Sequence, residues 1–372
     1  MAGKNKPDYI LCAATLILLI FGVLIIASVS ASLSQENLGH PFYYLKHQII
    51  FGILPGLVVG FIAYKIRLDL LKKWAPYLLL LNLILLGMVF LPKIGLRLLG
   101  ANRWLVIGPF TVQPSEFLKL TFVIYLATWL ASRVSEKRIA ERYLKKQFSQ
   151  TLIAFAIVLG IVGLLLYFQS DASTLGIIAL TAGTMYFLSG TPLWHSILII
   201  LMGSLGIISL IKLAPYRMKR FIVFLNPETD PLGIGYHIKQ ALVAVGSGGI
   251  LGLGLGMSRQ KFGFLPQSMS DSVFAIICEE MGLLGAVILI SLFLVFLWRG
   301  FKIARLSQDK FSQLLAIGIT SWIILQAFIN IGSMIAILPL SGIPLPFISY
   351  GGSALLVELM GVGILLNISK FI

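Results

Sequence analysis

The chain has 372 residues, of which 58% are hydrophobic and 12% are charged, and its 29 Lys and Arg outnumber its 14 Asp and Glu to give a net charge of +15. Soluble globular proteins carry about 25% charged residues. The composition therefore disfavours a water-soluble enzyme, a disordered segment and a disulfide scaffold. The two cysteines, Cys12 and Cys278, lie in separate apolar runs and offer no disulfide framework. A mean hydropathy of +0.96 predicts a polytopic membrane protein.

Long apolar runs follow one another along the whole chain. A transmembrane helix needs about 20 mostly apolar residues. Ten runs of this kind occur, at 9–31, 44–64, 75–92, 114–131, 150–168, 172–189, 192–213, 271–298, 311–338 and 348–369. The first run is too long for a signal peptide and lacks a small-residue cleavage site, so it is expected to stay as an anchor. We therefore expect an all-α membrane protein with about ten transmembrane helices, forming a single integral membrane domain over 1–372.

The basic residues predict the orientation of these helices. If the N-terminus is cytoplasmic, 17 of the 29 Lys and Arg lie on the cytoplasmic side, whereas the short loops of the other side hold 4. Lys and Arg accumulate in cytoplasmic loops of membrane proteins. Both termini are therefore expected in the cytoplasm. The positive charge then serves orientation, so it does not indicate a nucleic-acid partner.

The segment 214–270, between the seventh and eighth runs, is expected to be a large extracytoplasmic loop. It is rich in Gly, and seven basic residues lie between 212 and 270, against the positive-inside trend. Residues 235–251 have an amphipathic helical pattern that the following GLGLG run breaks. A helix that lies on the membrane surface or re-enters it fits this pattern. We expect the functional face of the protein here.

Asp271 stands at the start of the eighth run, in FLPQSMSDSVFAIICEEMG. An acidic residue at this position can cap the first turn of a helix. It can also act as a general base at the outer membrane surface. Glu279 and Glu280 would lie about 12 Å deeper on a straight helix, which argues against a paired-carboxylate site with Asp271. Within a transmembrane helix these two glutamates need charged partners or a watery cavity.

A second polar group lies in GANRWLVIGPFTVQPSEFLKL, residues 100–120. Glu116 and Lys119 are three positions apart, so they can form an ion pair on one helix face, and within a membrane such a pair is more often structural than catalytic. Arg103 and Trp104 precede the helix. They have two interpretations, an interfacial Arg–Trp anchor or a phosphate contact by Arg103.

The third polar group is PYRMKRF, residues 215–221, with Arg217, Lys219 and Arg220 on the expected outer side. Interfacial basic residues can bind anionic lipid headgroups. Beside an acidic residue they also suit a substrate that carries a pyrophosphate. The sequence leaves both alternatives open.

Several segments together resemble one family, the SEDS (shape, elongation, division and sporulation) proteins of bacteria. The resemblance covers nearly the whole chain. The segments that carry it are ANRWLVIGPFTVQPSEFLK, YRMKRFIVFLNPETDPLGIGYHIKQALVAVGSGG, GLGLGMSRQKFGFLPQSMSDSVFAIICEEMG and GIPLPFISYGGSALL. The third and fourth look more like the division-type FtsW branch than the elongation-type RodA branch.

The resemblance implies a ten-span peptidoglycan glycosyltransferase that polymerises lipid II at the outer face of the bacterial cytoplasmic membrane. Asp271 occupies the position of the family's essential aspartate. Other residues on family motif positions are Arg103, Trp104, Glu116, Lys119, Tyr236 and Gln240. The residues expected to bind substrate are Arg103, Trp104, Arg217, Lys219, Arg220, Tyr236, Gln240 and Lys261. Around Asp271 the chain departs from the family pattern, because Gln267, Met269 and Ser272 replace an acid, a His and an aromatic residue.

The resemblance also implies partners. The family is typically paired with a class B penicillin-binding protein, a transpeptidase, within the division or elongation machinery. It implies no organic cofactor and allows a divalent cation, Mg²⁺ or Mn²⁺. The expected reaction has Asp271 as general base toward the 4-hydroxyl of an acceptor lipid II, with inversion and loss of undecaprenyl pyrophosphate. A flippase or transporter of a lipid-linked sugar is the alternative, since it also accounts for ten spans and intramembrane charges.

Overall fold

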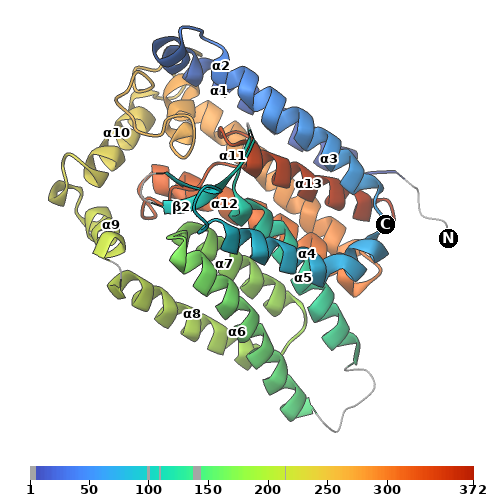
Figure 1. The fold of residues 1–372 in the computed structure, drawn as a ribbon. Coiled ribbons are helices and arrows are strands. Elements are labelled where there is room, and N and C mark those ends of the chain that lie inside the picture. The colour runs from blue at the N-terminus through green and yellow to red at the C-terminus, as the bar shows by residue number, and fades with distance from the viewer. Residues whose placement is uncertain (1–5, 99–100, 109, 137–143, 214) are drawn as a thin grey trace.

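A computed structural model describes residues 6–98, 101–108, 110–136, 144–213 and 215–372. It is a bundle of long helices, with both chain ends at one end of the bundle and the helices α9 and α10 at the other (Figure 1). Asp8 links the two chain ends, because its N–H donates to Ser369 Oγ over 2.9 Å. Its carboxylate caps α1 and also accepts from Arg299 Nε over 2.9 Å.

Helices occupy all ten of the expected apolar runs. They are α1 (Tyr9–Leu38), α2 (Tyr43–Gln48) continuing through the π-helical η1 (Ile49–Ile53) into α3 (Leu54–Lys65), α4 (Leu68–Met88), α5 (Pro114–Glu136), α6 (Leu144–Phe168), α7 (Ala172–Leu188), α8 (Leu193–Leu213), α11 (Val273–Leu306), α12 (Lys310–Met334) and α13 (Gly352–Ser369). Among the described residues, seven helical stretches are long and apolar enough to cross a membrane, and Ala172–Leu188 and Leu193–Gly206 are shorter apolar helices. The predicted all-α polytopic class is confirmed.

A small antiparallel sheet precedes α5, and the sequence analysis did not predict it. Its strands β1 (Gly95–Leu98), β2 (Ala101–Ile107) and β3 (Phe110–Val112) pair in the order β1-β2-β3. The Trp104–Ile107 run has the aromatic and β-branched residues that favour strands. Gly108 follows with a φ of 62°, which a glycine adopts without strain in the turn to β3. The sheet carries Arg103 and Trp104.

The segment 214–270 contains regular structure of its own. It forms α9 (Pro215–Leu225), the 3₁₀ turn η4 (Pro227–Thr229) and α10 (Ile234–Ser247), and residues 248–272 are irregular. The helix expected over 235–251 is confirmed, although it ends at Ser247, just before the glycine run.

The glycine run packs into a break in α11. Gly282 has a non-helical conformation, with φ 65° and ψ −163°, so α11 is two helical pieces joined at this residue. The run supplies hydrogen bonds at the break, because the N–H groups of Leu253 and Gly254 donate to the carbonyls of Glu279 and Glu280 over 2.9 and 3.0 Å. Irregular backbone at membrane depth is stable only where such partners exist. The helix expected in this segment is α10. The glycine run that follows it stabilises α11 at the break.

Candidate functional site

Asp271 lies immediately before α11, whose N-cap is Ser272. The Asp271 carboxylate accepts a hydrogen bond from Ser270 Oγ over 2.7 Å and none from the first turn of α11, so it does not cap the helix. Its side chain is half-buried. The half-buried carboxylate therefore accepts no hydrogen bond from the backbone of α11 and is available to exchange a proton.

Two other segments fix the backbone around Asp271. Asn330, on α12, donates from Nδ2 to the carbonyls of Asp271 and Ile343, both over 2.7 Å. The N–H of Tyr350 donates to the carbonyl of Met269 over 2.8 Å, and Ser349 Oγ donates to the carbonyl of Ser270. The segment between α12 and α13, which the sequence marks with PLPFISYGG, therefore forms a wall against Asp271. Asn330 was missed from the sequence because an amide inside an apolar run has no recognisable spacing.

Arg220, on α9, lies within electrostatic reach of Asp271. Burial lowers the pKa of Arg220, Tyr216 and Asp271 raise it, and the positive charges of Arg103 and Arg217 lower it. The guanidinium also donates from Nη1 to the carbonyl of Leu340 over 3.4 Å. Arg103 on β2 and Arg217 on α9 therefore lie within electrostatic reach of Arg220, as Asp271 does.

The other two arginines are anchored by neighbouring groups. Arg217 is buried, and its guanidinium carbon lies 5.1 Å from the ring centre of Tyr167 and 5.2 Å from that of Tyr216. Its Nε donates to the Tyr216 hydroxyl over 2.8 Å. Arg103 donates from Nη2 to the carbonyl of Ser170, just before α7. Each guanidinium is thereby oriented, and planar guanidinium groups suit phosphate oxygens.

His237, on α10, is a member of this group that the sequence analysis did not select. Its Nε2 lies 2.7 Å from Ser272 Oγ, and Ser272 Oγ donates to the carbonyl of Pro266 over 2.8 Å. Because the hydroxyl proton is used in that bond, Nε2 carries the proton shared with Ser272. Burial lowers the pKa of His237, Asp271 raises it, and Arg220 lowers it. The histidine therefore belongs electrostatically to the Asp271 site.

The two lysines expected to bind substrate each lie beside a carboxylate. Lys219 Nζ lies 3.1 Å from Asp230 Oδ2, and the same carboxylate accepts from the N–H of Ile234 at the start of α10 over 2.9 Å. Lys261 is buried, and its Nζ lies 3.0 Å from Glu280 Oε1. Both ammonium groups therefore form ion pairs within the protein.

The partners that Glu279 and Glu280 require inside the membrane come from α1 and the irregular segment. Ser28 Oγ donates to Glu280 over 2.7 Å, beside the Lys261 ammonium. Glu279 accepts from Ser258 Oγ and from the N–H of Arg259, the latter over 3.0 Å. Both carboxylates are thus satisfied by structural contacts away from Asp271.

A further polar network crosses the centre of the bundle. Lys119 Nζ lies 2.7 Å from Glu116 Oε2, with both side chains buried, and it donates to Gln326 Oε1 over 2.7 Å. Gln326 in turn donates to Glu358 Oε1 over 3.2 Å, and Glu358 accepts from the N–H of Phe347 over 2.8 Å. The ion pair therefore joins α5, α12 and α13 to the wall segment behind Asp271.

The remaining predicted residues lie on the elements that carry Arg103 and His237. Trp104 is half-buried on β2, and Tyr236 and Gln240 are half-buried on α10, four positions apart and so on one helix face. Within the described part of the chain, no three His, Cys, Asp or Glu side chains gather in a way that could hold a metal ion. A protein-held divalent cation does not fit a site that supplies one carboxylate and several arginines.

Comparisons with known proteins agree with this architecture. The sequence model of the FtsW/RodA/SpoVE family, described as cell cycle proteins, matches residues 9–372. Stage V sporulation protein E of Bacillus subtilis is 38% identical over 99% of this chain and 98% of its own. The probable peptidoglycan glycosyltransferase FtsW of Nitrosococcus halophilus is 39% identical over 98% of this chain and 92% of its own.

Solved structures share the fold. A chain from a structure on the coordination of polymerization and crosslinking by a peptidoglycan synthase complex is 25% identical, covers 98% of both chains and has a TM-score of 0.78. The rod shape determining protein RodA of Thermus thermophilus is 24% identical, over 98% of this chain and 97% of its own, with a TM-score of 0.69.

Proposed function

Because the chain belongs to the FtsW/RodA/SpoVE family, we propose that it is a peptidoglycan glycosyltransferase that polymerises lipid II in a bacterial membrane. The observation that carries this proposal is the arrangement around Asp271. The Asp271 carboxylate accepts no hydrogen bond from the first turn of α11 and lies within electrostatic reach of Arg220. The positive charges of Arg103 and Arg217 also reach the Arg220 guanidinium. A base beside a cluster of guanidinium groups suits a reaction that deprotonates a hydroxyl and releases a pyrophosphate.

Asp271 is the general base in this proposal. Its carboxylate takes the proton from the 4-hydroxyl of an acceptor lipid II, and the hydroxyl oxygen attacks the anomeric carbon of the growing glycan. The bond from that carbon to undecaprenyl pyrophosphate breaks as the glycosidic bond forms. Inversion follows from this single displacement, since Glu279 and Glu280 are held by structural partners and, among the residues that the structure describes, no second carboxylate is placed to form a covalent intermediate.

The three arginines take the leaving group. Arg103, Arg217 and Arg220 come from two elements, β2 and α9, and their planar guanidinium groups match phosphate oxygens in pairs. Trp104 follows Arg103 on β2, and Tyr236 and Gln240 lie on α10, where their aromatic and amide groups suit the sugars. Among the described residues no ligand set for a metal ion gathers at Asp271, so the proposed reaction includes no step through one.

The proposal is tested with purified protein and lipid II. We expect Asp271→Asn to reduce the formation of glycan strands by about 10²–10⁴-fold, the usual contribution of a general base. Glu228→Gln is the matched control, because Glu228 is an exposed acid of the same segment, paired with Lys239 at the surface. Glycan synthesis by Asp271→Asn at the rate of the unmodified protein would contradict the assignment.

A second experiment distinguishes the polymerase from the alternative, a lipid-linked sugar flippase. Proteoliposomes with fluorescent lipid II in one leaflet report its movement to the other. We expect strand synthesis without such movement. Movement of lipid II without strand synthesis would favour the transporter.

We also propose that both termini are cytoplasmic and that Asp271 faces the outside. The positive-inside rule supports this orientation. Its geometric counterpart is that the chain ends lie together at the end of the bundle opposite α9 and α10 (Figure 1). Labelling of single cysteines at Glu228 and at Lys73 by a membrane-impermeant reagent, in intact cells of a variant whose own cysteines are replaced, tests this. Only the cysteine at position 228 should react.

A class B penicillin-binding protein is the proposed partner, and division the proposed process. The similarity to a chain from a peptidoglycan synthase complex and the identity with FtsW relatives support these two statements. Lipid II polymerisation measured with and without the transpeptidase of the same cell tests the first. Depletion of the protein tests the second, since loss of septa rather than of cell elongation is expected.

A further inference from the structure

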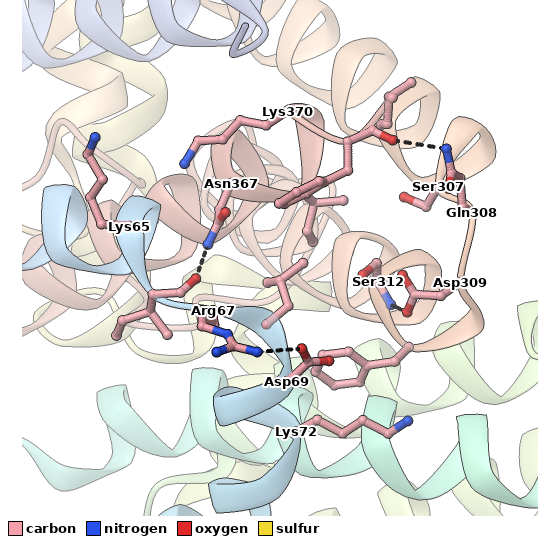
Figure 2. Close-up of a pocket in the computed structure, with 16 residues that line it drawn as sticks. Lys65, Arg67, Asp69, Lys72, Ser307, Gln308, Asp309, Ser312, Asn367 and Lys370 are labelled. Atoms are coloured by element: carbon pink, nitrogen blue, oxygen red, sulfur yellow. Dashed lines mark hydrogen bonds and ion pairs between the residues drawn. The ribbon is translucent and has the colours of Figure 1, made fainter. Parts of the chain in front are cut away.

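A cavity of about 650 Å³ lies at the end of the bundle opposite Asp271. α11 begins beside Asp271 and ends at the cavity, whose lining comes from the α3–α4 turn, the α11–α12 turn and the end of α13 (Figure 2). The proposed polymerase mechanism uses none of these residues.

Basic side chains outnumber acidic ones around the cavity. Its charged residues are Lys65, Arg67, Lys72, Lys370, Asp69 and Asp309. Arg67 and Asp69 form a pair with each other at the surface, over 3.7 Å. Asp309 accepts from the N–H of Ser312 over 2.8 Å and so caps α12. The acidic groups are thereby occupied.

The three lysines have no carboxylate partner among the described residues. Lys72 lies 6.0 Å from the ring centre of Phe311. Lys65 and Lys370 both lie at the ring of Tyr64, with Nζ at 5.7 and 3.3 Å from its centre, and Lys370 also donates to the Tyr64 carbonyl. The pKa of Lys370 is lowered by burial and, second, by the charge of Lys65. Both ammonium groups lie at one tyrosine ring, and an anion between two like charges would offset their repulsion.

A second cavity nearby shows the contrast. It has a volume of about 200 Å³, and Asp8 and Arg299 line it. There Arg299 Nε donates to both carboxylate oxygens of Asp8, over 3.1 and 2.9 Å, so the protein itself neutralises that guanidinium. The larger cavity contains no such pair for its lysines.

The lining is also apolar in part, which indicates an amphiphile rather than a free ion. Leu68, Phe311, Ile368 and Phe371 contribute to it, and Phe371 is exposed. The cavity lies at the ends of helices that are long and apolar enough to cross a membrane, including Leu68–Met88 and Gly352–Ser369. A membrane lipid presents both a phosphate and the start of its acyl chains at this level.

We propose that this cavity binds an anionic membrane phospholipid, with Lys65 and Lys370 contacting its phosphate, Lys72 at the rim and the apolar lining contacting the first carbons of its chains. The site belongs to the end of the molecule that the basic residues assign to the cytoplasm. It is separate in position from the proposed lipid II site.

The test uses the full-length protein in detergent, titrated with phosphatidylglycerol or with phosphatidylcholine of the same acyl chains. Native mass spectrometry counts the bound lipids. We expect the unmodified protein to prefer phosphatidylglycerol, and Lys65→Gln with Lys370→Gln to weaken its binding by roughly tenfold. The control carries Lys73→Gln and Arg305→Gln, which remove the same charge from exposed residues of α4 and α11 outside the cavity. The control should keep the preference.

Four results would overturn the proposal. The first is an unchanged preference in the cavity variant, and the second is an equal loss in the control. The third is displacement of the lipid by glycerol 3-phosphate at equal concentration, which would assign the cavity to a soluble phosphate ester. If an acidic peptide, and neither lipid, required Lys65 and Lys370 for binding, the cavity would instead be a protein contact.

Discussion

Single side chains around Asp271 hold its backbone, while its carboxylate stays free of α11. Asn330 has the central part in this, because one amide group bonds the carbonyls of Asp271 and Ile343. Without it, both carbonyls would be left without this donor. The side chain therefore ties the position of the proposed base to the wall segment behind it.

Asn330→Ala should lower the kcat of lipid II polymerisation more than it changes the KM. The base would move relative to the acceptor, and each unsatisfied buried carbonyl would cost about 1–3 kcal/mol of stability. Rates at several lipid II concentrations separate the two constants. Thr184→Ala is the control, because the Thr184 hydroxyl donates only within its own helix, to Leu180. An unchanged kcat in Asn330→Ala would show that Asp271 needs no such support.

His237 should make stability depend on pH. Its pKa in the folded protein is below the ordinary 6.5, so as the pH falls below about 6.5 the unfolded chain takes up a proton that the folded protein does not. Stability is therefore lost toward acid and unaffected above that range. Melting temperatures in detergent between about pH 7.5 and 5.5 should fall less in His237→Gln than in the unmodified protein. His40→Gln, which changes an exposed histidine, should fall as the unmodified protein does.

At the scale of elements, the glycine run and the break in α11 depend on each other. A Cβ at Gly252 would lie 2.2 Å from the Glu280 carbonyl oxygen, whereas a Cβ at Gly249 would meet nothing within 4 Å. Both glycines have positive φ, 81° and 55°. The pair therefore separates the cost of conformation from the cost of a clash.

We expect Gly249→Ala to lower the free energy of unfolding by only about 1 kcal/mol, the usual cost of a left-handed backbone for a residue with Cβ. Gly252→Ala should lower the free energy of unfolding several times as much, since the glycine run must move away from α11 and break its hydrogen bonds to it. Thermal unfolding in detergent measures both variants. Equal losses would mean that the run does not brace the break.

Sequence patterns predicted the elements unevenly, for physical reasons. Apolar runs of spanning length predict the helices, because the membrane interior requires apolar side chains and a backbone that satisfies its own hydrogen bonds. The strands of 95–112 are too short to give a pattern of comparable strength. The break at Gly282 comes from contact with residues 248–254, and a tertiary contact leaves no local signal. Asp271 was found through its motif, while His237 and Asn330 reach the site only through folding.

At the scale of the whole molecule, a buried polar network holds the bundle together. Lys119 bonds Glu116 and Gln326, and Gln326 bonds Glu358, so four transmembrane charges and amides on three helices satisfy one another. Removing one charge of a buried pair leaves the other without compensation, which costs about 3–5 kcal/mol. Removing both avoids much of that cost.

Lys119→Met should therefore be less stable than the double variant Lys119→Met with Glu116→Gln. Melting temperatures of the two single variants and the double variant give the coupling between the residues. Thr184→Ala again provides the unaffected control. If the double variant were destabilised by the sum of the single effects, Glu116 and Lys119 would not depend on each other.

The contacts of α1 have a consequence for how the chain is made. Ser28 bonds Glu280, which follows it by 252 residues, and Asp8 bonds Arg299 and Ser369, which follow it by 291 and 361 residues. Ribosomes add about 5–20 residues per second, so Ser28 enters the bilayer on the order of ten to fifty seconds before its acidic partner is synthesised. The first helix is thus inserted early and docked late. If a ribosome stalls before α11 is made, the first helix stays in the membrane without its partners. Membrane quality control can then recognise its unpaired polar groups.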